Sequence, residues 1–117
     1  MNFQEVKEIL GLDNLDQEGG WFNEIYRCKV PSSQQDRCCG TSIYYALAGK
    51  QISKFHKVTS DEIWLYHAGT PARQILLYED GHWEEHIIGP DLKAGQRPQS
   101  IIPAGTWQGA SLIDQSD

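Results

Sequence analysis

The sequence is short of cysteine, of basic residues and of long apolar runs. Its 117 residues hold 3 cysteines, and 10 Lys plus Arg against 16 Asp plus Glu give a formal net charge of −6. An acidic chain without a basic cluster is a poor binder of nucleic acid or of anionic membranes. No apolar run is long enough to span a bilayer, and the start of the chain lacks the basic and apolar regions of a signal peptide. These absences predict a cytoplasmic protein.

The cysteines Cys28, Cys38 and Cys39 do not follow a metal-binding pattern. Zinc sites usually separate their cysteines by two to four residues, whereas Cys38 and Cys39 are adjacent. An odd number of cysteines without secretory signals favours reduced thiols. The cysteines therefore predict neither a disulfide framework nor a zinc centre.

The length and the apolar pattern predict a single domain over residues 1–117. Phe3, Val6 and Leu10 recur at helical spacing before Gly11, which indicates a short N-terminal helix within residues 1–12. After the helix the sequence consists of short apolar stretches separated by turn residues. We expect strands over 21–28, 41–47, 52–58, 62–68, 72–78, 82–88, 99–102 and 107–113, with a hairpin turn at Glu79-Asp80-Gly81. This rhythm predicts an all-β sandwich or barrel that occupies residues 20–113.

His56 and Glu62 are the candidate chemical pair. In a strand–turn–strand hairpin, a histidine before the turn and a glutamate after it can meet across the ladder. A neutral imidazole beside a carboxylate can bind a divalent metal or act as an acid–base couple. Glu62 also shares one strand face with Trp64 and Tyr66, a composition that suits the wall of a ligand site as well as an ordinary core.

Two motifs add a resemblance to a known family. His56-x-Val58-x-x-x-Glu62, followed by Gly69, resembles the first motif of the cupin superfamily, and 103–108 (Pro-Ala-Gly-Thr-Trp-Gln) looks like its second motif. The phrases 18–22 (Glu-Gly-Gly-Trp-Phe), 60–64 (Ser-Asp-Glu-Ile-Trp) and 103–107 are similar to one branch, the small uncharacterised cupins called DUF985 or cupin-5. The resemblance covers roughly residues 14 to 112. It implies a double-stranded β-helix, or jelly-roll barrel.

The sequence departs from the cupin motifs at two metal-ligand positions. Val58 stands where the first motif has its second histidine, and Gln108 stands where the second motif has its histidine. Of the usual ligands only His56 and Glu62 remain, with Gln108 as a poor third donor. Losing two imidazoles lowers the affinity for transition metals. We therefore expect no cofactor, or a weakly bound divalent metal.

The resemblance to cupin sugar isomerases and epimerases implies one function, an enzyme that acts on a small sugar-like molecule. His56 would remove a proton next to a carbonyl, Glu62 would orient the imidazole or hold a metal, and Tyr66 or Tyr26 would return the proton. In the structural alternative, His56 and Glu62 pair inside the barrel and catalyse nothing.

The second hypothesis is a binding module without catalysis. Glu24, Tyr26, Trp64 and Gln108 would then line a site for a carbohydrate or a small planar metabolite. A metal-dependent dioxygenase ranks last, because that chemistry needs two histidines and one carboxylate on one metal.

The end of the sequence predicts self-association. The chain stops soon after the second motif, where relatives generally continue through further strands, and an unpaired sheet edge must be covered. Trp107 precedes Gln108 on the same strand and points to the opposite face, against another sheet or a partner. We therefore expect a homodimer, or an exchange of strands between copies, that covers the edge.

Overall fold

The computed structural model describes residues 1–29 and 40–115 of the chain. Cys38 and Cys39 lie outside these residues. The described part contains α1 (Phe3–Leu10), β1 (Asp13–Asn14), β2 (Trp21–Arg27), β3 (Thr41–Ala46), β4 (Ile52–Lys57), β5 (Glu62–Leu65), β6 (Ala72–Leu77), β7 (Trp83–Ile88), the 3-10 helix η1 (Leu92–Ala94), β8 (Gln99–Ile102) and β9 (Trp107–Leu112). The prediction of an all-β chain with a short N-terminal helix is confirmed.

Helix α1 begins and ends where its sequence dictates. The Asn2 side chain accepts from the Glu5 backbone N–H, and the Glu5 carboxylate accepts from the Asn2 N–H, which is a complete capping box. Gly11 ends the helix with φ +64°, a left-handed conformation that glycine adopts at little cost. Phe3 packs on Trp21 of β2 at 6.1 Å between ring centroids, so the helix covers one face of β2.

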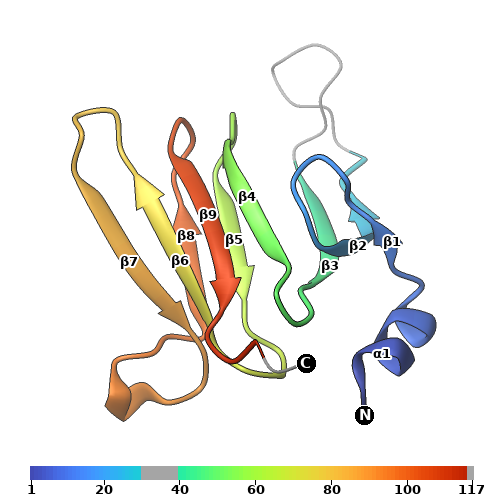
Figure 1. Ribbon diagram of the computed structural model, residues 1–117. Coiled ribbons are helices and arrows are strands. Elements are labelled where there is room, and N and C mark those ends of the chain that lie inside the picture. Colours follow the sequence, from blue (N-terminus) through green and yellow to red (C-terminus); the bar gives the residue numbers. More distant parts are fainter. Residues whose placement is uncertain (30–39, 116–117) are drawn as a thin grey trace.

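The first sheet has the strand order β1-β2-β3 and presents two different faces (Figure 1). Trp21 and Asn23 face the helix, since Asn23 Nδ2 donates to the Leu10 carbonyl. Phe22 pairs with Tyr45 across the ladder, and the Tyr45 ring meets Trp64 of β5 edge to face at 5.5 Å. The face that carries Phe22 and Tyr45 therefore looks towards the rest of the barrel.

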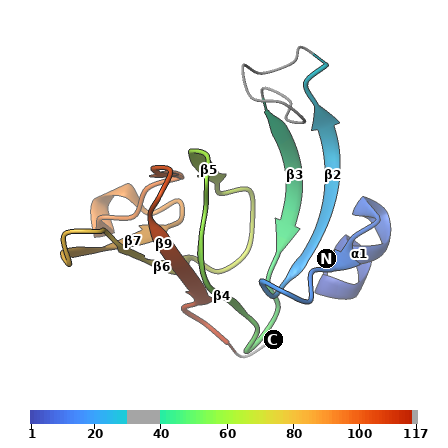
Figure 2. The same cartoon turned by 90° about the horizontal axis from the view of Figure 1, so that it is seen from above.

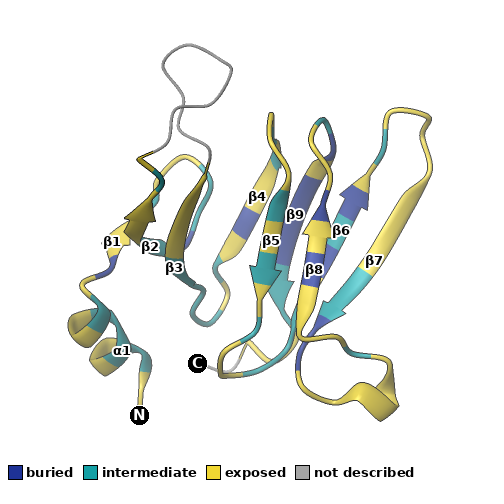
Figure 3. Ribbon diagram, turned by 180° about the vertical axis from the view of Figure 1, so that it is seen from behind, coloured by how far each residue is buried: buried dark blue, intermediate teal, exposed yellow. Residues whose placement is uncertain are grey.

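The other strands form two layers that lie one behind the other in Figures 1 and 3. One layer is an antiparallel sheet in the order β4-β9-β6-β7, and the second is the pair β5-β8. Alternation along β6 and β8, and the register of β9 with β6, turn the buried side chains Gln74, Leu76, Ser100, Ile102, Gln108 and Ala110 into the space between the layers, which we call the barrel interior. Seen from above, the β2-β3 hairpin stands beside both layers (Figure 2).

Among the described residues, buried polar side chains are as numerous as buried apolar ones. The buried apolar side chains among the described residues are Leu12, Leu76, Ile88, Ile102 and Ala110, and the buried polar ones are Ser53, Gln74, Ser100, Thr106 and Gln108. Figure 3 shows the buried segments concentrated on β6, β8 and β9. Buried polar groups destabilise a protein unless they are hydrogen-bonded, so each of them raises the question of its partner.

Most element boundaries agree with the expected ones to within a residue or two. The Glu79-Asp80-Gly81 hairpin is confirmed, with Gly81 at φ +92° and Tyr78 N–H donating to the His82 carbonyl. The short strand β1 and the 3-10 helix η1 were not expected. No helix in the described part of the chain is long and apolar enough to cross a membrane.

Candidate functional site

A β-bulge in β4 determines where His56 points. Ser53 pairs with Ala110 and His56 with Gln108, so three steps along β4 match two along β9, and Lys54 and Phe55 both lie opposite the same position. Phe55 lies against Gly109 on the outer face: a Cβ on Gly109 would stand 2.8 Å from the Phe55 ring. The extra residue allows Ser53 and His56 to share the inward face.

The expected hairpin between the strands of His56 and Glu62 does not form. β4 pairs with β9 and β5 pairs with β8, so the segment 58–61 crosses from one layer to the other. His56 and Glu62 instead belong to opposite layers, and Gln108 is next to both: it pairs with His56 in the β4–β9 ladder and donates to Glu62. The prediction of a cross-strand pair was wrong because the connection joins two layers rather than two neighbouring strands.

Gln108 connects the two layers at this point. Its Nε2 donates to Oε1 of Glu62 at 3.1 Å, and the Trp64 indole N–H donates to the same oxygen at 2.9 Å. Gln108 is 0% exposed, and its Oε1 has no hydrogen-bond partner among the residues that the structure describes. The predicted residues Glu62, Trp64 and Gln108 therefore form one cluster, with an unsatisfied acceptor at its centre.

His56 is held by groups other than Glu62. Its Nδ1 lies 2.7 Å from the Lys54 carbonyl, to which it can only donate, so in the neutral ring the lone pair is on Nε2. Nε2 lies 3.7 Å from a carboxylate oxygen of Glu18. The imidazole is thus fixed in one orientation, with the carboxylate partner supplied by the loop before β2.

Tyr45 is a residue of this site that the sequence did not reveal. Its hydroxyl donates to the Gly19 carbonyl at 2.6 Å. Burial raises the pKa of Tyr45 to about 12, with the nearby carboxylates of Glu18 and Glu62 acting in the same direction against a hydrogen bond with Ser53. Tyr45 therefore remains a neutral phenol at physiological pH.

Glycine makes room for the Tyr45 ring. Gly20 has φ +85°, and a Cβ there would lie 2.4 Å from the Tyr45 hydroxyl oxygen. The pair Gly19-Gly20 was the one available signal that a bulky group approaches this loop, although a glycine pair alone cannot identify that group.

The remaining predicted residues lie away from the cluster. The Tyr66 hydroxyl donates to the Gly69 carbonyl at 2.7 Å. A register shift in β2 pairs Glu24 with Ile43 but Tyr26 with Ser42, so Glu24 and Tyr26 point to opposite faces, with Tyr26 on the side away from the barrel. Glu24 lies on the barrel side and forms an ion pair with Arg27 at 2.9 Å.

The donor set does not fit a transition-metal centre. Among residues 1–29 and 40–115 there is no group of three or more His, Cys, Asp or Glu side chains placed to hold a metal. Gln108 turns its N–H, not its oxygen, towards Glu62, and a metal ligand must offer the oxygen. Val58 lies beyond the end of β4, where its carbonyl accepts from the Gly105 N–H.

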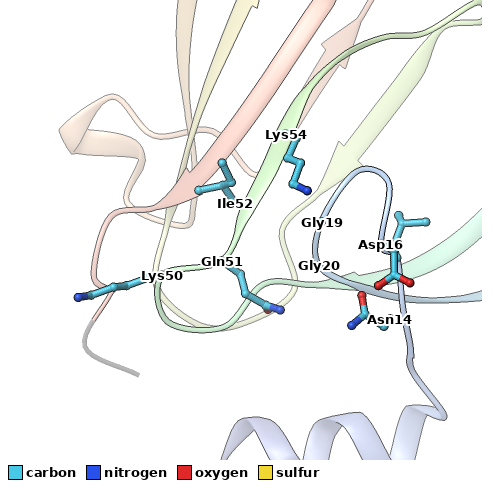
Figure 4. A pocket seen from close by; sticks show the side chains of 9 residues that line it. Asn14, Asp16, Gly19, Gly20, Lys50, Gln51, Ile52 and Lys54 are labelled. Carbon is cyan, nitrogen blue, oxygen red and sulfur yellow. The ribbon is translucent and has the colours of Figure 1, made fainter.

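A separate open hollow of about 320 Å³ lies between the loop before β2 and the start of β4 (Figure 4). It is lined by Asn14, Leu15, Asp16, Gly19, Gly20, Lys50, Gln51, Ile52 and Lys54. None of the predicted site residues lines it, and we place the candidate site in the barrel interior because the unsatisfied polar atoms are there.

Comparisons with known proteins agree on one group. A family model described as "Cupin superfamily (DUF985)" matches residues 4–117. Over 114 residues the chain is 27% identical to the uncharacterized protein YML079W of Saccharomyces cerevisiae, which covers 86% of this chain. The match spans 56% of the yeast protein, so the chain corresponds to little more than half of that relative.

Two solved structures are similar to the whole chain. Protein SO0799 from Shewanella oneidensis superposes with a TM-score of 0.91 at 30% identity, over 98% of this chain and 72% of that one. A hypothetical protein from Leishmania major gives a TM-score of 0.88 at 25% identity, over 100% of this chain and 74% of that one. Neither name states an activity or a ligand.

Proposed function

The chain belongs to the Cupin_5 (DUF985) family of the cupin superfamily, and from this premise we propose that it binds a small hydroxylated molecule in the barrel interior. The observation that carries the proposal is Oε1 of Gln108, a fully buried acceptor without a partner. Leaving such an atom unsatisfied costs roughly 1–3 kcal/mol. A ligand hydroxyl that donates to Oε1 would remove this cost.

The surroundings of Gln108 suit a ligand of the polarity of a monosaccharide. Trp64 and Tyr45 meet edge to face and offer aromatic surface to C–H groups. Both hydrogen bonds to Glu62 end on Oε1, which leaves Oε2 to accept from a further hydroxyl. Several acceptors and few donors in one place favour a ligand rich in O–H groups, in keeping with the carbohydrate binding expected from the sequence.

The experiment is a binding screen of the full chain against neutral monosaccharides, polyols and sugar acids, read by ligand-detected NMR and thermal shift. A compound that binds the wild-type chain but not Gln108→Leu supports the proposal. Gln115→Leu, on the exposed C-terminal segment, serves as the matched control and should bind as the wild type does. Binding that is equal in wild type and Gln108→Leu would place the ligand elsewhere and contradict the proposal.

A second candidate is a sugar isomerase or epimerase, and the fixed orientation of His56 favours it. Because Nδ1 lies against the Lys54 carbonyl, Nε2 is held as the basic nitrogen, and the Glu18 carboxylate would stabilise the imidazolium formed by proton abstraction. Tyr45, a neutral phenol near the carboxylates of Glu18 and Glu62, would return the proton in place of Tyr66, which lies outside this cluster. Conversion of a bound sugar, followed by NMR, separates this enzyme from the binding module.

We also propose that two copies associate through the outer face of the four-stranded sheet. Trp107, Leu77 and Trp83 stand side by side on β9, β6 and β7. With Ile52 and Phe55 they are 40–62% exposed, leaving on the order of 500 Å² of apolar side chain in water. A standard interface buries about 800 Å² per partner, roughly 57–65% of it apolar. The area of this face therefore matches what a stable dimer requires.

A further inference from the structure

A second buried amide lies in the barrel interior, on β6. Gln74 is 0% exposed, and within the described part of the chain its Nε2 has no hydrogen-bond partner. Its Oε1 accepts from the Ser100 hydroxyl of β8 at 2.6 Å, so the side chain extends between the two layers. Gln74 pairs with His86 and Leu76 with Gln108 in the register of the sheet, so Gln74 is a diagonal neighbour of Gln108. One amide lacks an acceptor and the other lacks a donor.

A chain of hydrogen bonds leads from Gln74 to the surface. The Ser100 hydroxyl lies 2.7 Å from Nδ1 of His86, and Nε2 of His86 lies 3.3 Å from Glu84. Exposure increases along this series of hydrogen bonds: residue Ser100 is 4% exposed, the His86 side chain 31% and the Glu84 side chain 48%. Glu84 also accepts from the Tyr78 hydroxyl at 2.8 Å. An imidazole in contact with water is thus connected to an amide that is not.

We propose that Gln74 is a second ligand-contacting group, and that His86 and Ser100 decide whether it offers the ligand a donor or an acceptor. When His86 is protonated, both ring nitrogens donate, one to Ser100 and one to Glu84. The single Ser100 hydroxyl proton then goes to Oε1 of Gln74, and Nε2 faces the interior. This end of the site takes a carbonyl or carboxylate oxygen of the ligand.

Loss of one proton from His86 to solvent reverses the direction of the hydrogen bonds that join His86, Ser100 and Gln74. The carboxylate of Glu84 keeps the remaining proton on Nε2, because the other tautomer would set a nitrogen lone pair against it. Nδ1 then accepts from Ser100, whose oxygen accepts in turn from Nε2 of Gln74 once the amide has rotated. Oε1 now faces the interior, and this end of the site takes a hydroxyl or N–H group.

The groups around His86 support this reading. Glu84 is its charged contact, and hydrogen bonds from Tyr78 and from His86 hold the pKa of Glu84 below its usual range, with His82 contributing by its charge. β8 and β6 contribute the uncharged Ser100 and Gln74. Arg73 and Glu85 pair with each other at 2.8 Å and belong to the opposite face of the sheet. The negative charge beside Nε2 is therefore present in both protonation states of His86.

The test needs no ligand and uses the ¹⁵N-labelled full chain. The His86 ring nitrogens and the Gln74 side-chain amide are followed by NMR across the His86 titration, with Gln74→Leu used to assign the amide signals. We expect the neutral ring to carry its proton on Nε2 and the Gln74 signals to shift with the same midpoint as the ring. A proton on Nδ1 in the neutral ring, or Gln74 signals that ignore the titration, would overturn the proposal.

Two variants separate coupling from stability. Ser100→Ala removes the connecting hydroxyl and should uncouple Gln74 from His86, whereas Ser100→Thr keeps a hydroxyl and should preserve the coupling. His82→Gln removes a neighbouring imidazole that takes no part in the hydrogen bonds between His86, Ser100 and Gln74, and it should also leave the coupling intact. Coupling that survives in Ser100→Ala contradicts the proposal. If Ser100→Ala does not fold, the wild-type titration and Ser100→Thr still decide.

The consequence for selectivity rests on the proposed binding function. Below the pH at which His86 is half protonated, the affinity for a sugar acid relative to that for its neutral monosaccharide should rise roughly tenfold. This is about the value of one hydrogen bond. Ser100→Ala should lose this shift. Failure of every sugar to bind would reject the proposed function and leave the NMR result standing, whereas binding with an unchanged ratio would reject the role of Gln74.

Discussion

Gln108 Nε2 donates to Glu62 Oε1 across 46 residues of sequence and between the two layers of the barrel, at 3.1 Å. This bond joins β9 to β5, strands that share no ladder. It also orients the amide, because a nitrogen committed to Glu62 leaves the Gln108 oxygen without a partner. The same contact thus contributes to the packing of the two layers and presents the acceptor on which the proposed function depends.

Gln108→Leu should separate binding from stability. The substitution removes the bond to Glu62 but also removes the unsatisfied oxygen, and the two effects oppose each other. We expect the free energy of unfolding to change by no more than about 1 kcal/mol, while binding of any sugar found in the screen is lost. Urea denaturation beside the binding measurement checks this. A loss of stability of several kcal/mol would show that the amide is mainly structural.

Tyr45→Phe should change the response to alkali. A raised folded-state pKa means that the stability contributed by Tyr45 is fully present below about pH 10 and is lost as the pH rises towards about 12. With allowance for partial exposure, wild type should lose on the order of 1–2 kcal/mol more than the variant across this range. At neutral pH the variant should be less stable by about 1 kcal/mol, for the lost bond to Gly19. Parallel alkaline profiles would contradict the assignment.

Gly19→Ala and Gly81→Ala form a matched pair for the close approach of the Gly19 loop to β4. Both glycines have φ +92°, so both variants bear the same backbone strain, roughly 1–2 kcal/mol. A Cβ at Gly19 would also lie 2.0 Å from the Ile52 carbonyl oxygen, whereas at Gly81 it meets nothing within 4 Å. Thermal denaturation should show Gly19→Ala to be less stable than Gly81→Ala by at least about 2 kcal/mol. Equal losses would mean that the loop moves freely away from β4.

His56→Gln tests the enzymatic candidate. For any sugar that the wild type converts, we expect kcat to fall roughly 10²–10⁴-fold, the usual contribution of a positioned base, while KM changes little. Glu18→Gln should lower kcat less, because the Lys54 carbonyl still holds the ring. An unchanged kcat in His56→Gln would eliminate the base. If the wild type binds a sugar without converting it, the result favours the binding module without catalysis.

Trp83→Lys should disrupt the proposed dimer. Trp83, the first residue of β7, pairs with Leu77 and is 62% exposed, so a charge there would be buried by a second copy. Analytical ultracentrifugation should show the dimer dissociation constant raised by at least about 30-fold, as for an interface residue worth about 2 kcal/mol. Ile9→Lys changes an equally exposed apolar residue on α1 and should not affect association. A wild-type monomer at every concentration would reject this interface.

The strands were predictable because alternation and turn residues are local signals. Glu79-Asp80-Gly81 determines its hairpin through the turn alone, and Gly11 ends α1 in the same way. The layer assignment was not local: the four residues between β4 and β5 look like a hairpin loop, yet they cross between layers. Distinguishing these cases requires knowledge of which strands pair, and pairing depends on β8 and β9 far along the chain.

The candidate site was predictable in part for the same reason. Glu62, Trp64 and Gln108 were found because their strands alternate regularly. Tyr26 was misplaced on the face of Glu24 because an extra residue in β2 shifts its register. Glu18 and Tyr45 come from segments that reach the site only after the first sheet has packed against the barrel, and no spacing in the sequence marks that contact.

The bulge in β4 has an evolutionary consequence. Lys54 lies within it, donates its backbone N–H to the Glu18 carbonyl, and accepts with its own carbonyl from Nδ1 of His56. Removing one of the two residues opposite Gly109 would leave His56 on the same side of the strand but take away the backbone geometry that holds the ring. A lineage could thus acquire or discard an oriented imidazole through a one-codon insertion or deletion, without any substitution among the side chains that face the barrel interior.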